Sequence, residues 1–416
     1  MADVSTSKPT ARCPQCGAEI PVNQGYLTWC DACGWNLMAA DRAAPKTGSE
    51  AIAAMSADRG SEETVTTGRG DRRVRIALAL AAVGVYLFVG TLAVGGIWLE
   101  LITFPNPFAM LPVAAMIGAA WYARPRPDSP EPPLLDRADH PVLHELADTL
   151  ADQVGSARLD GIALTTDYDA WIGRYGWRQR RVITLGVPLL AVLGSQERAA
   201  LLAHEIAHER RGDRWRALLV GTAGNALAAL MELLEPEQMA MVVGERRYQR
   251  PSTLSRTVAN LGMALICALV KPFVLLFGML EARHVRRIEA EADRVSVEVA
   301  GAPAVRSALI KSRASHTLST LAASAAADGD PDVIGRLRRR STETPGREWL
   351  RIERVMAMDR PALYAPPSGV AELLGERPPR VVVTDAQAFE LERELLPHEQ
   401  AVSRELLERH RASIYR

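Results

Sequence analysis

Long apolar runs separated by mixed, charged segments are the clearest pattern along the chain. Residues 76–98 are twenty-three consecutive positions without a charge, enough for a helix to cross the hydrocarbon core of a bilayer. Residues 101–123 are also uncharged but contain Pro105 and Pro107 near their start, so we expect a connection followed by a shorter second span. The pattern predicts a transmembrane helical hairpin over residues 74–124.

Arginines flank this predicted hairpin on its outer sides. Arg72, Arg73 and Arg75 precede the first run and Arg124 follows the second, whereas the turn between them carries Glu100 and no arginine. Positive charge is retained on the cytoplasmic side of a membrane. We therefore expect a multi-pass protein of the cell membrane, in contact with membrane lipid, with the segments on both sides of the hairpin facing the cytoplasm.

Two further apolar runs leave the number of spans open. Residues 217–234 are apolar but short, and residues 258–280 carry Lys271 and Pro272 in the middle. They are either two more membrane spans or a buried pair of helices, so the pattern allows two or four spans in all.

The chain beyond the hairpin has the mixed periodicity of a globular domain. Residues 141–154 and 195–211 are typical of amphipathic helices, and residues 161–166 and 181–185 are typical of strands. Between the strands, residues 171–177 form an aromatic stretch interrupted by glycine, which predicts a hairpin or a loop. The expected fold class is α+β, mostly helical, with a small mixed sheet.

The last part of the chain has a different composition. Residues 328–416 begin rich in arginine and proline, and a helix is expected from residue 385 to residue 416 with a break at Pro397. We expect this part to complete or decorate a globular domain at residues 134–327.

Composition and charge narrow the class of protein. Hydrophobic residues make up 48% and charged residues 24% of the 416-residue chain, which excludes a disordered polypeptide. Lysine and arginine together number 49, as do aspartate and glutamate, so the net charge is zero. No nucleic-acid partner is expected, because such binders carry a strong positive charge.

Four of the five cysteines lie close together near the N-terminus. Cys13 and Cys16 form one CxxC pair, and Cys30 and Cys33 form a second. Four thiolates in two such turns complete a tetrahedral shell around one structural zinc ion. We predict a zinc ribbon over residues 1–40 that has a binding role, with a protein partner as a candidate, followed by a flexible linker over residues 41–73.

The helix predicted at residues 195–211 contains His204, Glu205 and His208. Residues four apart share a helix face, so both imidazoles can reach one metal ion. Glu205 lies about 100° around the helix from His204, where it can act as a base toward water. This spacing predicts a zinc hydrolase site.

A third ligand is expected from the acidic segment downstream. Glu289 and Asp293 are four residues apart and share a helix face, whereas Glu291 points away. We assign Glu289 to the metal and Asp293 to a hydrogen bond that orients a ligand histidine. An ordinary acidic patch on a charged helix is the alternative for these residues taken alone.

The two motifs together resemble those of the HtpX-type membrane zinc metallopeptidases, a family that also contains the CAAX prenyl endopeptidases. The resemblance rests on residues 203–208 with Arg211 and Asp213, and on Arg286, Glu289 and Asp293 in the order of an ExxAD motif. It covers roughly residues 135–365. It implies a zincin-like, gluzincin endopeptidase domain with His204, His208 and Glu289 on catalytic zinc.

The expected function is a membrane-bound zinc endopeptidase that cleaves membrane or cytosolic proteins. Two zinc ions are expected, one catalytic and one structural. Glu205 is the expected general base, and the strand at 181–185 is a candidate edge for pairing with an extended protein or peptide substrate. A proteolytically inactive membrane adaptor is the alternative, but an intact Glu205 argues against it.

Overall fold

The structure is a computed structural model that describes residues 10–22, 26, 28–37, 69–124, 133–210, 214–233, 274, 276–280, 288–359 and 378–414. The predicted linker up to residue 68 and most of the apolar run at 258–280 lie outside the described residues. So do Arg211, Asp213 and Arg286.

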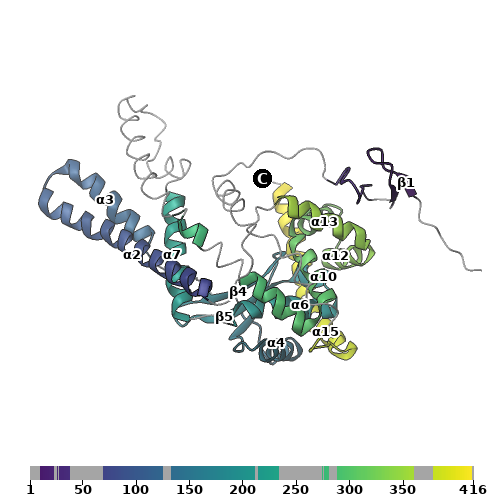
Figure 1. The fold of residues 1–416 in the computed structure, drawn as a ribbon. Helices are drawn as coiled ribbons and strands as arrows, with labels where there is room; N and C mark the ends of the chain where they lie inside the picture. The colour runs from purple at the N-terminus through teal and green to yellow at the C-terminus, as the bar shows by residue number, and fades with distance from the viewer. Residues whose placement is uncertain are drawn as a thin grey trace, which may run out of the picture.

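An elongated helical hairpin projects from one side of the molecule (Figure 1). Helix α2 (Arg69–Thr103) is followed by a short turn and by α3 (Pro107–Tyr122), which runs back along it. The two helices approach closely where α2 has small residues: a Cβ on Gly96 would lie 3.0 Å from Ile117 Cγ1. Close backbone approach at glycine is typical of helix pairs in membranes.

Helix α7 (Arg214–Leu233) packs against this hairpin. The Tyr86 hydroxyl on α2 donates to Leu219 O over 2.7 Å and lies 2.5 Å from Thr222 Oγ1. Phe277, near the end of the run predicted at 258–280, is buried in the same apolar cluster. Parts of all four predicted apolar runs therefore meet in one bundle.

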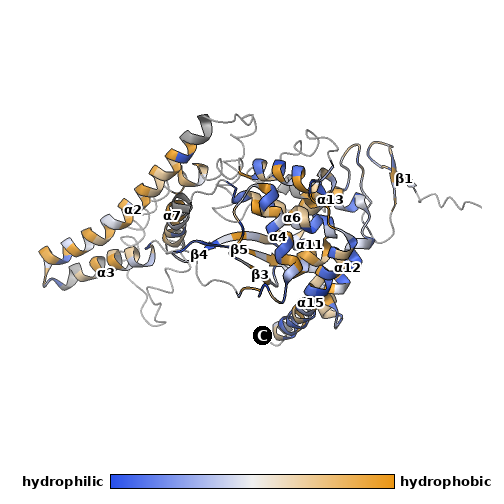
Figure 2. Cartoon of the chain, turned by 90° about the horizontal axis from the view of Figure 1, so that it is seen from below, coloured by the Kyte–Doolittle hydropathy of each residue, from blue (hydrophilic) through white to orange (hydrophobic). Residues whose placement is uncertain are grey.

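The outward face of α2 is apolar and exposed. A stripe of large side chains spaced seven residues apart faces away from the bundle: Leu80, Leu87, Val94 and Leu101. Within the described residues, one helix is long and apolar enough to cross a membrane, over Val74–Thr103. Figure 2 shows α2 and α3 hydrophobic over most of their length. At sixteen residues, or about 24 Å, α3 is shorter than α2.

A three-stranded mixed sheet lies in the part of the chain after the hairpin. Its strands are β3 (Gly161–Thr165), β4 (Ala170–Tyr175) and β5 (Arg180–Gly186), in the order β3-β5-β4. β3 pairs with β5 in parallel and β4 pairs with β5 antiparallel. The aromatic stretch at 171–177 is thus mostly strand.

The expectation that the strand at 181–185 lies at an edge is wrong. β5 is the central strand. The tight turn between β4 and β5 places β4 along one side of β5, and β3 pairs with the other side. β4 is therefore an outer strand of the sheet.

Helices cover the sheet and enclose one large apolar core. They are α4 (Pro141–Val154), α5 (Val187–Val192), α6 (Ser195–His208), an unlabelled helix at residues 288–300, α10 (Ala302–Arg313), α11 (Ser315–Ala327), α12 (Val333–Glu343), α13 (Gly346–Asp359) and α15 (Asp385–Ile414). Leu150, Ile183 and Ile206 are completely buried in this core. Burial of each such side chain contributes about 2 kcal/mol.

The expected helix break at Pro397 is also wrong, because α15 continues through it. Leu391 and Leu395 before the proline and Val402 after it are buried in the core. Packing on both sides outweighs the single backbone hydrogen bond that proline removes. α12 and α15 thus complete the core rather than decorate it.

The four N-terminal cysteines lie on a small separate unit, called here the four-cysteine unit, within residues 10–37. Strands β1 (Thr10–Arg12) and β2 (Glu19–Pro21) form an antiparallel pair. Gly17 and Gly34, which each follow the second cysteine of a pair, have φ values of 73° and 72°. L side chains rarely adopt this conformation, so glycine is required to close each turn.

Candidate metal centre

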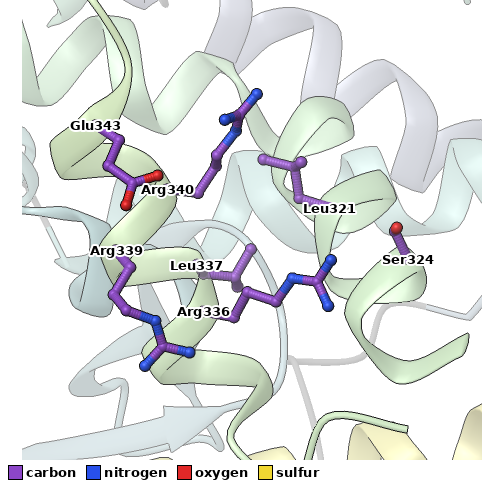
Figure 3. Close-up of a pocket in the computed structure, with 7 residues that line it drawn as sticks. All are labelled: Leu321, Ser324, Arg336, Leu337, Arg339, Arg340 and Glu343. Atoms are coloured by element: carbon purple, nitrogen blue, oxygen red, sulfur yellow. The ribbon is translucent and has the colours of Figure 1, made fainter. Parts of the chain in front are cut away.

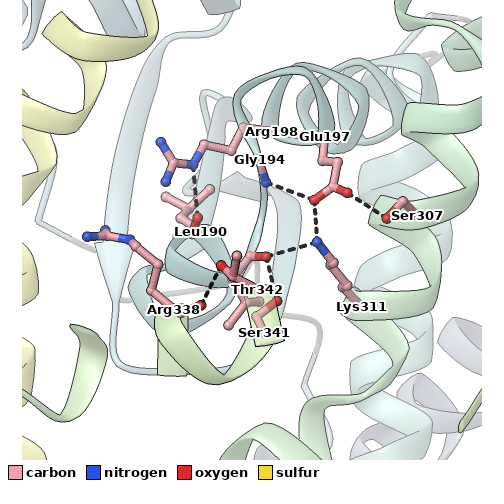
Figure 4. A network of polar contacts seen from close by, with 10 residues as sticks. Leu190, Gly194, Glu197, Arg198, Ser307, Lys311, Arg338, Ser341 and Thr342 are labelled. Carbon is pink, nitrogen blue, oxygen red and sulfur yellow. Dashed lines mark hydrogen bonds and ion pairs between the residues drawn. The ribbon is translucent and has the colours of Figure 1, made fainter. Parts of the chain in front are cut away.

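The helix that carries the HExxH motif is fixed at its start by a partly buried polar network (Figure 4). The Glu197 carboxylate accepts a hydrogen bond from the Gly194 N–H at 2.8 Å and another from the Ser307 hydroxyl at 2.5 Å. Lys311 Nζ lies 2.7 Å from Glu197 Oε2 and also donates to Val192 O. α10 thereby holds the N-terminus of α6.

A second set of contacts joins α6 to α5. Arg198 is 2% exposed, and its Nε donates to Leu190 O at 2.9 Å. The Ser341 hydroxyl of α12 donates to Val192 O at 3.0 Å. Because both ends of the short α5–α6 connection are held, the histidines further along α6 have a defined position.

His204, His208 and Glu289 come together between α6 and the 288–300 helix. Their ligand atoms all lie within 4.8 Å of one another. His204 Nε2 is 3.4 Å from Glu289 Oε2, and His208 Nε2 is 3.8 Å from Glu289 Oε1. The side chains from two separate helices therefore converge on a single point.

This donor set fits zinc. Two imidazole nitrogens and one carboxylate are a known set for catalytic zinc, with metal–ligand distances near 2.05 Å, which place neighbouring ligand atoms about 3.4 Å apart in a tetrahedron. The distances from Glu289 to His204 and His208 are close to that value. The three residues form one of the two candidate metal groups among the described residues.

Asp293 lies behind His204. Its Oδ1 is 3.1 Å from His204 Nδ1, and both residues are buried. The ring thus presents Nε2 toward Glu289 and Nδ1 toward Asp293. A carboxylate in this place fixes the tautomer of a metal-ligating histidine and makes the ligand nitrogen more basic.

The pKa values of the two histidines differ strongly. Burial and, to a smaller extent, the charge of His204 lower the pKa of His208 to about 4, so His208 is neutral at pH 7. Burial alone would lower the pKa of His204, but the Asp293 and Glu289 carboxylates raise it to about 10. A metal ion bound at Nε2 would replace that proton.

Glu205 lies on the same turn of α6. Burial, with a smaller contribution from the charges of Glu289 and Asp169, raises the pKa of Glu205 to about 8 against the opposing charge of His204. A carboxylate with a pKa near the working pH is suited to accept and return a proton. Asp169 approaches because position 186 is glycine: a Cβ there would lie 2.1 Å from Asp167 O and 2.7 Å from Asp169 O.

Several residues around the site were not anticipated from the sequence. Arg174 on β4 pairs through both Nε and Nη2 with Glu209, the residue after His208, and both side chains are largely buried. Arg313 at the end of α10 contributes a positive charge that lowers the pKa of Glu289. The sequence pattern did not point to Arg174 or Arg313 as site residues, because the acidic residues that they act on are distant in the sequence.

The four N-terminal cysteines form the second candidate metal group. Cys13 Sγ lies 3.6 Å from Cys33 Sγ, and Cys16 Sγ lies 3.6 Å from Cys30 Sγ. Tetrahedral zinc with Zn–S bonds near 2.3 Å places its sulfur ligands about 3.8 Å apart. The thiols are not joined in disulfides, so this donor set also fits zinc.

A cavity of about 380 Å³ lies between α11 and α12 (Figure 3). Its wall includes Arg336 and Arg339, but Asp328 and Asp330 pair with Arg336, and Asp332 pairs with Arg339. None of its lining residues belongs to the metal cluster. The positive charge is balanced within the protein, so the cavity has no evident part in the chemistry.

A family model described as peptidase family M48 matches residues 137–344. This range is half of the chain and contains His204, Glu205, His208, Glu289 and Asp293. No curated protein and no solved structure gave a significant match to the chain.

Proposed function

Because the chain belongs to peptidase family M48, we propose that it is a membrane-bound zinc endopeptidase that hydrolyses peptide bonds of membrane or cytosolic proteins. The observation that carries the proposal is the convergence of His204, His208 and Glu289, with Glu205 on the adjoining turn of the same helix. The family implies a metallopeptidase that uses zinc and acts on proteins or peptides.

His204, His208 and Glu289 would hold the catalytic zinc ion, and Asp293 would orient His204. When bound, zinc polarises the scissile carbonyl and lowers the pKa of water. Glu205 accepts a proton from the attacking water and delivers it to the leaving amine. The raised pKa of Glu205 supports this role, because the carboxyl group must both accept and release the proton near neutral pH.

The substrate would lie along β4. β3 and β4 are the two outer strands of the described three-stranded sheet, and β4 is the one that packs against α6. An extended peptide can add to such an edge through backbone hydrogen bonds. The paired Arg174 and Glu209 tie this strand to the end of α6, which would keep the bound peptide in a fixed relation to the metal ligands.

Four membrane spans, with both the four-cysteine unit and the peptidase domain in the cytoplasm, are part of the proposal. The long apolar α2, and the packing of α3, α7 and Phe277 against it, support a membrane bundle. Arg124 stacks on the Trp121 ring at 3.9 Å at the end of α3, and an aromatic residue beside an arginine is typical of the membrane interface.

Two substitutions test the catalytic assignment. Glu205→Gln keeps the ligand set, so the full-length protein should retain its catalytic zinc but lose at least about a hundredfold in peptide hydrolysis. Glu289→Ala removes a metal ligand, so the protein should lose both its catalytic zinc ion and its activity. Metal analysis and a quenched-peptide assay on detergent-solubilised protein provide the measurements.

Glu298→Gln is the matched control. Glu298 lies on the same helix as Glu289 and pairs with Arg294 and Arg380. This substitution should leave zinc content and activity unchanged. Hydrolysis by Glu205→Gln at the wild-type rate would refute the proposed role of Glu205. A wild-type protein that binds zinc but cleaves no peptide would instead favour an inactive adaptor.

A further inference from the structure

The four-cysteine unit is docked on α13 through a buried tryptophan. Trp29 is fully buried. The Arg347 guanidinium stacks over its ring with 4.6 Å between the guanidinium carbon and the ring centroid. The same guanidinium donates to Trp29 O at 2.6 Å and to Pro21 O at 2.8 Å. One arginine thus binds the backbone of both cysteine-bearing segments and one aromatic face.

Neighbouring residues extend the contact on both sides of Arg347. Arg354 Nη1 lies 2.7 Å from Asp31 Oδ1, and its guanidinium carbon is 5.4 Å from the Trp29 ring. Tyr26 lies under the Arg340 guanidinium at 4.9 Å, with its hydroxyl 3.4 Å from Thr344 Oγ1. The charged groups with which α12 and α13 contact the four-cysteine unit are mainly arginines, and the unit meets them with aromatic rings, backbone carbonyls and a carboxylate.

Both halves of this contact lie largely outside the family match. The match begins at residue 137 and ends at residue 344, whereas the four-cysteine unit lies before it and Arg347 and Arg354 lie after it. The chain therefore carries the docking helix together with the unit that it binds.

The backbone carbonyls reach Arg347 because the cysteines shape the two segments. Pro21 follows the first CxxC turn, and Trp29 precedes Cys30. In small zinc units held by four cysteines, metal binding and folding are coupled, since the apo form lacks a sufficient core of its own. Loss of a metal ion from the cysteines would therefore release Trp29 O and Pro21 O from the positions in which Arg347 binds them.

The contact continues from α13 toward the catalytic helix. Lys311 on α10 lies 5.9 Å from the centroid of the Trp349 ring on α13. The same lysine pairs with Glu197 at the start of α6. Two packed helices, α13 and α10, therefore connect the four-cysteine unit to the helix that carries His204 and His208.

We infer that the four-cysteine unit is a zinc-dependent clamp within the chain, whose binding partner is the α12–α13 surface of the same molecule. Zinc in the four cysteines orders the unit, the ordered unit binds Arg347 and Arg354, and the bound unit stabilises α13. By linkage, zinc stabilises the ordered unit, and therefore also the docked form, which requires the unit to be ordered. The inference does not depend on peptidase activity.

Hydrogen–deuterium exchange of the full-length protein tests the clamp. Arg347→Ala should raise amide exchange of residues 28–37 and 346–359 at least about tenfold, since each hydrogen bond from a charged donor has an effect of that size. Tyr26→Ala, on the other side of the contact, should raise exchange of the same two segments to a lesser extent. Arg339→Ala is the matched control, because Arg339 is an exposed arginine of α12 that pairs with Asp332 rather than with the four-cysteine unit.

Removal of the metal should have the same effect as removal of Arg347. A variant with Cys16→Ser and Cys33→Ser should lose one zinc ion per chain, and exchange of residues 346–359 should rise to the level seen in Arg347→Ala. Unchanged exchange of 346–359 in this variant, or an equal rise in Arg339→Ala, would overturn the clamp. Full zinc content in Arg347→Ala shows that the unit itself remains folded.

Discussion

At the scale of single residues, the contact between His204 and Asp293 decides which nitrogen is offered to a metal. Asp293 is 5% exposed and its carboxylate faces Nδ1, so Nε2 is the nitrogen that meets Glu289. The His204 side chain is equally buried, which leaves its ring little freedom to turn. Affinity for the metal therefore depends on a residue that does not touch it.

Asp293→Asn should weaken zinc binding at this centre by about 10–100-fold, the usual effect of removing the partner of a ligand histidine. The amide is similar in size but carries no charge to orient the Nδ1–H or to raise the basicity of Nε2. Zinc affinity is measured by chelator competition on the full-length protein. Wild-type affinity in Asp293→Asn would contradict the orienting role.

The spacing along one helix is what makes these residues recognisable in a sequence. His204 and His208 are four apart, as are Glu289 and Asp293, so each pair lies on one face whatever the rest of the fold does. Arg174 and Glu209 are thirty-five positions apart, and their pairing depends on how β4 lies against α6. Local periodicity carries no information about such a contact.

At the scale of elements, the start of α6 is held by a largely buried ion pair between its own Glu197 and Lys311 of α10. Burial would raise the pKa of Glu197, but hydrogen bonds from Lys311, Ser307 and the Gly194 N–H lower it below the ordinary value. A carboxyl group with a lowered folded-state pKa stabilises the protein above its unfolded pKa. That contribution is lost as the pH falls through the folded pKa.

Lys311→Met should lower the free energy of unfolding by about 3 kcal/mol at pH 7, because it leaves the Glu197 charge buried without its partner. Without the lysine, burial raises the pKa of Glu197, so acid neutralises the unpaired charge. The difference from wild type should therefore begin to shrink as the pH falls through the raised pKa of Glu197 in the variant, and continue to shrink down to its lowered pKa in the wild type. Thermal and chemical unfolding across this pH range measure it.

Arg393→Met removes an exposed ion pair with Glu390 and serves as the control. It should change the free energy of unfolding by less than about 0.5 kcal/mol. A loss in Lys311→Met that is the same at pH 4 and pH 7 would show that the lysine acts through packing alone.

The order of strands and the course of α15 show why elements were easier to predict than their arrangement. The residues of β5 have the apolar run of a strand, yet nothing within that run states which strands lie beside it. Pro397 is a local signal against helix, but buried Leu391, Leu395 and Val402 keep α15 continuous. In both cases packing with distant segments decided the outcome.

At the scale of the whole molecule, the sequence indicated the separate parts but not how they are joined. The four-cysteine unit, the apolar runs and the HExxH domain each have a local signature. The docking of Trp29 on Arg347 joins residues more than three hundred positions apart. The bundle contact of Tyr86 with Leu219 is also long-range, so neither contact could be predicted from spacing.

In the proposed four-span topology, the short connection between α6 and α7 limits the distance of the metal ligands from the bilayer. α6 ends at His208 and α7 begins at Arg214, so six Cα–Cα steps span at most about 21 Å. The apolar part of α7 begins at Leu218, one helical turn or about 6 Å later. If α7 enters the membrane there, the metal ligands lie within about 27 Å of its surface.

This distance limit would restrict cleavage to segments close to the membrane in substrates that are anchored in the same membrane. A cleavable segment on a rigid helical spacer should be cut when the spacer is shorter than about eighteen residues, which span about 27 Å, and spared when it is twice as long. A flexible spacer of the longer length can fold back and should restore cleavage. Equal cleavage at both rigid lengths would show that the active site can leave the surface. Cleavage with the short rigid spacer but not with the long one would show that distance from the bilayer determines which peptide bond is cleaved.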